Sequence, residues 1–169
     1  ALRRREPTAR LVIAPRRPER FTAVVDLVAR AGMACARRTT LPEAGWIGGD
    51  VLVLDTLGEL ALVYPMATVV FVGGSLAPAG GHNVLEPAVA GRAIVVGPHM
   101  ENFQEIAAAF LAEDALVQVR DAAGLAEAVL RLFADAAARD ALGERARAIV
   151  ARNRGALDRT VDALAGLLA

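Results

Sequence analysis

Short apolar runs alternate along the chain with longer segments in which apolar residues recur at helical spacing. A run that is apolar throughout is typical of a strand with both faces buried, as in a parallel sheet. The runs of strand length lie at residues 10–14, 33–38, 50–54, 68–72, 93–96 and 116–119. The intervening pattern predicts helices over residues 18–31, 55–66, 84–90 and 102–111, followed by two or three alanine-rich helices from residue 121 onward.

This alternation of strand and helix predicts an α/β fold of the Rossmann-like type, with a doubly wound parallel sheet. Ligands bind to such sheets outside the carboxyl ends of the strands. Polar or glycine-rich segments follow the predicted strands at that edge, at residues 15–17, 55–59, 73–86 and 97–99. We therefore expect these segments to converge on one binding edge.

The segment at residues 73–86 carries the most distinctive chemistry. Glycines such as Gly73 and Gly74 let backbone N–H groups approach an anion closely, and the helix that follows adds the positive end of its dipole. The glycine spacing matches neither the P-loop nor the dinucleotide-binding fingerprint, so neither mechanism can be transferred. The pattern predicts a phosphate site of another kind.

Several side chains of this segment have both a structural and a functional interpretation. Asn83 and Glu86 have the spacing of a helix N-cap and its capping-box partner. A carboxylate fixed at a helix start could equally accept hydrogen bonds from two ribose hydroxyls. His82 either donates to a phosphate or sugar carboxylate or bonds the loop backbone. Ser75 is either a phosphate ligand or a turn former.

Two earlier segments carry further candidates. Arg16, which follows Pro15, is either a guanidinium that forks onto phosphate oxygens or an ordinary surface arginine. Thr56 and Glu59 have capping-box spacing. Gly58 lies between them, and a glycine inside a helix costs about 1 kcal/mol relative to alanine. That cost indicates a ligand approaching the backbone at this point.

Composition limits the classes of protein. The 169 residues, 55% of them hydrophobic, suffice for one folded domain, and residues 1–10 are predicted to form a polar linker into it. No apolar run approaches the roughly 18 residues of a membrane span, and the first residues lack the pattern of a signal peptide. A single cysteine, Cys35, excludes an internal disulfide, and with only two histidines a structural zinc site is not expected.

The basic residues are all arginine and are unevenly placed. Residues 1–38 contain ten arginines against three acidic residues, whereas the chain as a whole is neutral. A basic surface suits nucleic acid, acidic lipid headgroups or a phosphorylated sugar lipid, unless the arginines are simply solvated.

Taken together, the motifs resemble those of the bacterial transferases of 3-deoxy-D-manno-octulosonic acid (Kdo). The family pattern has Gly-Gly-Ser-Leu, Gly-Gly-His-Asn and Leu-Glu in this order, as residues 73–86 do. Three further family motifs have close counterparts here. They are Pro-Arg before Pro-Glu-Arg-Phe, Asp-Thr-Met-Gly-Glu-Leu, and Gly-Pro-His before Asn-Phe. The departures are Arg17 for histidine, Leu57 for methionine and Val84 for proline.

The resemblance implies that residues 11–169 are the C-terminal, donor-binding half of a two-domain GT-B glycosyltransferase, the N-terminal half being absent. It implies that this domain binds the donor CMP-Kdo, and for Glu86 it favours the ribose contact over the cap. The implied donor contacts are Pro15, Arg16, Leu57, Gly58, Glu59, Gly73, Gly74, Ser75, His82, Asn83, Val84, Leu85 and Glu86.

The implied reaction moves Kdo from CMP-Kdo to a lipid A precursor in lipopolysaccharide biosynthesis, without a metal or other cofactor. The absent half would supply the acceptor site, the catalytic carboxylate and a peripheral contact with the cytoplasmic face of the inner membrane. This fragment is then expected to be soluble and inactive, with no catalytic residue and no nucleic-acid partner. The alternatives are the nucleotide-binding half of another GT-B glycosyltransferase or UDP-sugar epimerase, and a non-catalytic interaction module.

Overall fold

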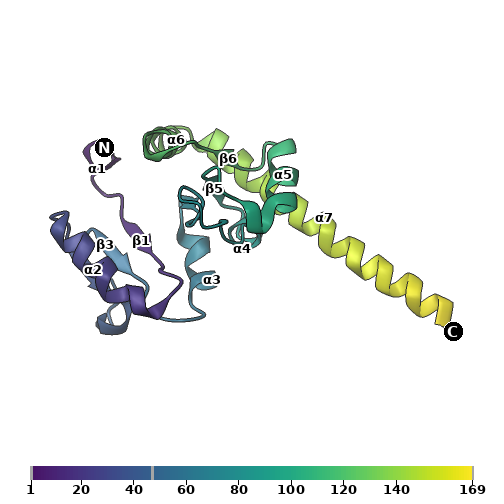
Figure 1. The fold of residues 1–169 in the computed structure, drawn as a ribbon, viewed down its shortest axis with the longest axis horizontal. Helices are drawn as coiled ribbons and strands as arrows, with labels where there is room; N and C mark the ends of the chain where they lie inside the picture. Colours follow the sequence, from purple (N-terminus) through teal and green to yellow (C-terminus); the bar gives the residue numbers. More distant parts are fainter. Residues whose placement is uncertain (1, 47, 169) are drawn as a thin grey trace. The chain divides into compact units, whose positions relative to one another are not determined.

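The computed structural model describes residues 2–46 and 48–168, with the side chains of residues 3 and 154–168 excepted. The chain forms two compact units that divide between Val63 and Tyr64. In Figure 1 the first unit is coloured purple and blue, and the second runs through teal and green to yellow. The first unit contains α1 (Leu2–Arg5), β1 (Leu11–Ile13), the 3-10 turn η1 (Pro18–Arg20), α2 (Phe21–Arg30), β2 (Cys35–Arg37), η2 (Arg38–Thr40), β3 (Val51–Val53) and α3 (Leu60–Val63).

The first unit is built on a three-stranded parallel sheet in the order β1-β3-β2. The central strand β3 pairs with both neighbours, so that Leu52 is level with Val12 on one side and Ala36 on the other. All three residues of β3 are buried, as expected of an apolar strand with neighbours on both sides. Helix α2 packs against β2 and β3 and buries Val28.

The second unit has its own three-stranded parallel sheet, in the order β4-β5-β6. Its elements are η3 (Tyr64–Met66), β4 (Val69–Phe71), α4 (Leu85–Val89), β5 (Ala93–Val96), η4 (Glu101–Phe103), α5 (Gln104–Ala112), β6 (Val117–Gln118), α6 (Ala122–Ala134) and the long α7 (Ala136–Leu168).

Successive residues of β5 face two different cores, which explains why this strand is apolar throughout. Ile94 and Val96 lie in a cluster with residues of α4, α5 and α7, including Phe110 and Ile149. Ala93 and Val95 lie in a second cluster with residues of α6 and α7. Helices therefore cover both faces of this sheet, as the sequence pattern predicted.

The parallel α/β class and the strand positions are confirmed, while several helix boundaries are wrong. Residues 55–66 were expected to form one helix, but α3 begins only at Leu60 and gives way to η3. Gly58 has φ +82°, a left-handed conformation that helices do not contain. A short helix, α1, forms at residues 2–5, within the expected linker.

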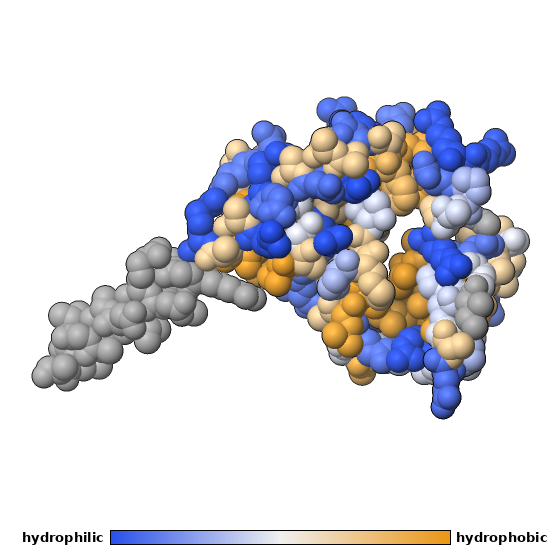
Figure 2. All heavy atoms as spheres, turned by 180° about the vertical axis from the view of Figure 1, so that it is seen from behind, coloured by the Kyte–Doolittle hydropathy of each residue, from blue (hydrophilic) through white to orange (hydrophobic). Residues whose placement is uncertain are grey.

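The surface mixes polar and apolar side chains. The face shown in Figure 2 has hydrophobic patches between hydrophilic ones. Large apolar side chains that remain exposed include Leu57, Leu62 and Met66. Within residues 2–46 and 48–168, no helix has the length and apolarity that a membrane span requires.

Helix α7 crosses the end of α4 with no space for a side chain between the two backbones. A Cβ at Gly143 would overlap the carbonyl oxygen of Gly91, which lies two residues beyond the end of α4 and adopts φ +65°. Because the obstacle is backbone, it cannot rotate away. Because residue 143 is glycine, α7 can pack directly against the end of α4.

We predict that Gly143→Ala lowers the free energy of unfolding by about 1–3 kcal/mol, because the added methyl group forces the two backbones apart. Gly124→Ala in α6 is the matched control, since its Cβ would make only ordinary contacts with Val119 and Asp121. That second substitution should stabilise the protein by about 0.5–1 kcal/mol. Urea unfolding followed by circular dichroism measures both, and equal effects of the two substitutions would contradict the close approach.

Candidate functional site

The glycine loop, residues 72–84, joins β4 to α4 and is the centre of the candidate site in the second unit. Gly74, Gly80 and Gly81 have φ values of +71°, +79° and +70°, which side chains rarely tolerate. Gly81 donates its N–H to the Gly74 carbonyl at 3.0 Å, which closes the loop on itself. The sequence prediction of a glycine-dependent loop between strand and helix is confirmed.

Ser75 joins the glycine loop to the loop after β5. Its side chain is fully buried, and its hydroxyl donates to the Val72 carbonyl and accepts from the Gly97 N–H at 2.8 Å. The Ser75 carbonyl in turn accepts from the His99 N–H at 2.9 Å. The only hydroxyl proton is already donated, so the structure places Ser75 in the role of loop former.

Residues 97–102 complete the junction between the two loops. Asn102 donates its backbone N–H to the Gly80 carbonyl at 3.0 Å, and its side chain donates to the Ala79 carbonyl at 3.4 Å. Asn102 lies inside η4 and bonds across to the glycine loop. The segments at 73–86 and 97–99 are therefore brought together as predicted.

Asn83 and Glu86 do not form the capping box that was one interpretation of their spacing. Asn83 accepts from the Leu85 N–H at 2.9 Å, but α4 begins at Leu85 with Val84 at the cap position. Glu86 is then the second helical residue, one position short of the one that can reach back. Its side chain is exposed and forms no hydrogen bond or ion pair with the part of the chain that the structure describes. The carboxylate is thus available to a ligand.

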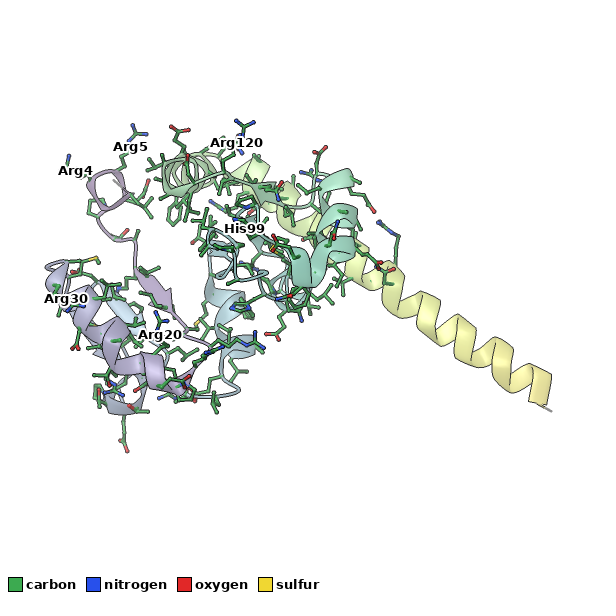
Figure 3. All side chains as sticks on the ribbon, in the orientation of Figure 1. Arg4, Arg5, Arg20, Arg30, His99 and Arg120 are labelled. Carbon is green, nitrogen blue, oxygen red and sulfur yellow. The ribbon has the colours of Figure 1, made fainter. Side chains whose placement is uncertain are left out.

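The other residues of this segment differ in what they can offer a ligand. Val84 is fully buried, and the partly buried Leu85 packs against the core. The half-buried His82 ring lies against Gly74, where a Cβ would be 3.3 Å from Nε2. His99 lies on the neighbouring loop (Figure 3), and its Nδ1 is 3.0 Å from a Glu101 carboxylate oxygen.

A cavity of about 540 Å³ lies beside Glu86, between α4, α5 and α7. Its lining is mostly apolar, with carboxylates only from Glu86 and Glu105. An apolar, acidic cavity does not suit a phosphate. This cavity is therefore not the phosphate site that the sequence predicts.

The remaining candidates lie in the first unit, at the carboxyl ends of two adjacent strands. β1 and β3 are paired in parallel, and the Leu54 N–H continues their ladder by donating to the Ile13 carbonyl at 2.8 Å. Pro15 and Arg16, which follow β1, therefore lie at the same edge as the segment after β3. Arg16 is exposed there.

Glu59 is held by two partners at this edge. Arg38 contacts its carboxylate through Nε at 3.0 Å and Nη2 at 3.1 Å, and the Thr56 hydroxyl donates to it at 2.6 Å. Thr56 is not a helix cap, since α3 begins at Leu60. Gly58 also lies outside the helix, so the free-energy cost of a glycine within a helix does not arise. A positive φ explains why glycine is found at this position. Leu57 is 76% exposed on the same bend.

Asp55 anchors the start of this segment and was not singled out by the sequence. Its carboxylate is buried and accepts from the Thr39 N–H and hydroxyl at 2.9 and 2.7 Å and from Arg37 Nε at 2.7 Å. Burial alone would raise the pKa of this carboxyl group, but the hydrogen bonds from Thr39 and Arg37 outweigh it and lower the pKa to about 2. Asp55 therefore ties the loop after β2 to the end of β3.

Several basic residues of the N-terminal part contact other side chains of the first unit. Arg37 and Arg38 hold Asp55 and Glu59, and Arg10 lies over the Trp46 ring at 5.1 Å. Arg4, Arg5, Arg20 and Arg30 are exposed on α1, η1 and α2 (Figure 3).

Comparison with known proteins identifies the family. No protein-family model matches the chain. It is 40% identical over 158 residues to the 3-deoxy-D-manno-octulosonic acid transferase of Bordetella pertussis and 36% identical over 167 residues to that of Haemophilus influenzae. These matches cover 94% and 97% of this chain but 37% and 38% of the relatives. The crystal structure of the C-terminal CMP-Kdo binding domain of WaaA from Acinetobacter baumannii superposes with a TM-score of 0.77 at 36% identity, covering 82% of this chain and 72% of that one.

The chain belongs to the Kdo transferase family. The family resemblance seen in its motifs is confirmed, as is the Rossmann-like α/β class. The chain spans little more than a third of the length of the curated transferases that it matches.

The Kdo transferase motifs fall into one group in each unit. The structure brings together the two segments after β4 and β5, and separately the two after β1 and β3. The convergence of all four segments, and the individual donor contacts, remain predictions. In the described parts of the chain, no three His, Cys, Asp or Glu side chains gather as a metal site would require.

We predict that Ser75→Ala lowers the free energy of unfolding of this Kdo transferase domain by about 1–3 kcal/mol, because the buried Gly97 N–H loses its acceptor. Thr68→Ala, at an exposed hydroxyl before β4, is the control and should be neutral. Urea unfolding compares the two variants. A variant that kept full stability and lost only nucleotide affinity would show that Ser75 acts mainly as a ligand.

Asp55 predicts a specific response to acid. Its pKa is about 2 when folded against an ordinary value of 3.8, so its stabilising effect is complete above the ordinary value and disappears as the pH falls through 2. Asp55→Asn should therefore reduce stability at pH 7 by on the order of 1–2 kcal/mol and flatten the loss of stability towards pH 2.

The fluorescence of Trp46, the single tryptophan, reports unfolding of the first unit, which contains Asp55. Glu43→Gln, at an exposed carboxylate in the loop before β3, serves as the control. Identical pH profiles for the wild type and Asp55→Asn would refute the assignment.

Proposed function

We propose that this chain is the CMP-Kdo binding domain of a Kdo transferase. The observation that carries the proposal is the match to the solved CMP-Kdo binding domain, with a TM-score of 0.77 at 36% identity over 82% of this chain. The geometry supports it, because the glycine loop is fixed by Ser75 and Asn102 and leaves the Glu86 carboxylate open to a ligand. A ribose presents two neighbouring hydroxyls, which one carboxylate can accept.

The donor contacts follow from this proposal. Backbone N–H groups of the glycine loop, including those of Gly73 and Gly74, and the guanidinium of Arg16 bind the phosphate of CMP. Glu86 binds the ribose. The exposed bend at Leu57 and Gly58, braced by Glu59 and Arg38, presents its backbone to the nucleotide.

The reaction of the complete enzyme is part of the proposal. An acceptor hydroxyl of a lipid A precursor attacks the anomeric carbon of Kdo, the bond from that carbon to the phosphate oxygen breaks, and CMP departs. A base outside this domain takes the hydroxyl proton. The contribution of this domain is to stabilise the growing negative charge on CMP with fixed dipoles and Arg16, which needs no metal ion.

The other half of the proposed enzyme supplies the acceptor site, the catalytic carboxylate and the contact with the cytoplasmic face of the inner membrane. The 169-residue chain by itself then binds CMP and transfers nothing. No nucleic-acid partner is invoked.

The test is calorimetric titration of the chain with CMP, UMP and inorganic phosphate. We expect CMP to bind more tightly than UMP, and Glu86→Gln to raise the dissociation constant for CMP at least about tenfold, because a charged acceptor of two hydrogen bonds is lost. Glu105→Gln is the matched control, because that carboxylate lines the same cavity from α5 and has no proposed contact with the donor.

Equal affinity for UMP and CMP would favour a glycosyltransferase or epimerase that uses UDP-sugars. The absence of nucleotide binding by a folded chain would contradict the proposal and favour an interaction module. Circular dichroism of each variant verifies that it is folded.

A further inference from the structure

His99 and Glu101 form a hydrogen-bonded pair beside the glycine loop, and neither is among the proposed donor contacts. The Nδ1 atom of His99 lies 3.0 Å from a Glu101 carboxylate oxygen. Hydrogen bonds from its own backbone N–H and then from the His99 ring lower the pKa of the Glu101 carboxyl group, so this group is ionised at neutral pH. An ionised carboxylate can only accept a hydrogen bond, and the shared hydrogen therefore belongs to Nδ1 of His99.

The backbone on both sides of this pair is bonded to the glycine loop. The His99 N–H donates to the Ser75 carbonyl at 2.9 Å. The Asn102 N–H donates to the Gly80 carbonyl at 3.0 Å. The His99 carbonyl also lies so close to Gly81 that a Cβ there would be 2.9 Å from its oxygen. The imidazole is therefore carried by a backbone segment that is held against the loop proposed to bind phosphate.

The second nitrogen of the His99 ring is open to a ligand. In the described part of the chain its Nε2 has no hydrogen-bond partner, and the side chain is 33% exposed. The two joined loops, residues 72–84 and 97–102, contain neither arginine nor lysine. A positive side-chain charge from these loops can therefore come only from histidine, and His82 and His99 are the two histidines that they contain.

We propose that His99 donates its Nε2–H to the phosphate of the donor and that Glu101 is the positioning residue that directs this nitrogen. The inference rests on the proposed function for the place of the phosphate, whereas the bond between Glu101 and His99 exists without a ligand. Because Nδ1 is engaged by Glu101, Nε2 is the nitrogen left for the ligand. The negative charge of the phosphate favours the protonated ring, in which both nitrogens are donors. A hydrogen bond between two charged groups is stronger than one between neutral groups.

The first experiment tests the positioning without a ligand. At alkaline pH, where imidazole is neutral, proton–nitrogen NMR spectra show which ring nitrogen carries the hydrogen, and His99→Asn identifies the signal of His99. The wild type should hold the hydrogen on Nδ1. Glu101→Ala should shift it towards Nε2, the form that an unconstrained side chain prefers, whereas Glu101→Gln should retain it on Nδ1, because the amide oxygen accepts the same bond. An unchanged ratio of the two forms in Glu101→Ala overturns the role of Glu101.

The second experiment tests the contact with the phosphate by titration with CMP and with cytidine, which lacks the phosphate. His99→Asn keeps a donor near the position of Nδ1 and has none at that of Nε2. It should raise the dissociation constant for CMP about tenfold and leave that for cytidine within about twofold of the wild type.

Two variants of Glu101 separate its role as an acceptor from its charge. Glu101→Ala and Glu101→Gln lose the same negative charge, but only the glutamine can still hold Nδ1. Glu101→Ala should therefore bind CMP about three- to fivefold more weakly than Glu101→Gln. Glu105→Ala, which removes an exposed carboxylate from α5, is the control and should bind CMP as the wild type does.

The outcomes distinguish this inference from the proposed function. If the folded wild type binds no CMP, both are refuted. If CMP binds and His99→Asn does not weaken it, the phosphate contact of His99 is refuted and the proposed function stands. Equal weakening of CMP and cytidine by His99→Asn would also refute the inference, because the ring would then contact the nucleoside. Equal affinities of Glu101→Ala and Glu101→Gln for CMP would refute the positioning role, and circular dichroism verifies that each variant is folded.

Discussion

The candidate site of the second unit depends on one close backbone contact. Gly97 lies so near to Ser75 that a Cβ would overlap the Ser75 carbonyl, and the Ser75 hydroxyl accepts the Gly97 N–H in the same place. The glycine loop and the loop after β5 are thereby joined where each leaves the sheet. Backbone N–H groups can bind an anion only if their directions are fixed in advance, since reorienting them on binding would cost conformational entropy. This contact supplies that rigidity.

The polar residues of the two units play different parts. In the first unit Asp55 and Glu59 are already occupied by Arg37 and Arg38, so these charges hold the loops after β2 and β3 in place. In the second unit Glu86 has no ion-pair partner among the described residues, and its position is determined by the packing of α4. A carboxylate without an internal partner can bind a ligand, whereas a paired carboxylate such as Asp55 or Glu59 holds a loop in place.

The local features of the fold and site were predictable from the sequence, and the long-range pairings were not. Apolar runs located the strands because a strand covered by helices on both faces buries every residue. In β5, alternate residues lie in two different apolar clusters. Parallel strand order then brought residues 73–86 and 97–99 together. The bond between Asp55 and Arg37 depends on β2 and β3 being neighbours with a particular register, which no local pattern encodes. The capping patterns at Thr56 and Asn83 misled because the same spacing occurs in bends that precede a helix.

The crossing of α7 over Gly91 also has a consequence for the order in which the chain acquires its structure. The surface on which α4 rests is supplied by a helix that is synthesised long after it. On the ribosome, β4, the glycine loop and α4 emerge first and have no partner for the far side of α4 until α7 follows. Helix α4, which follows the glycine loop, is therefore among the first parts of the second unit to be synthesised and among the last to acquire its full packing.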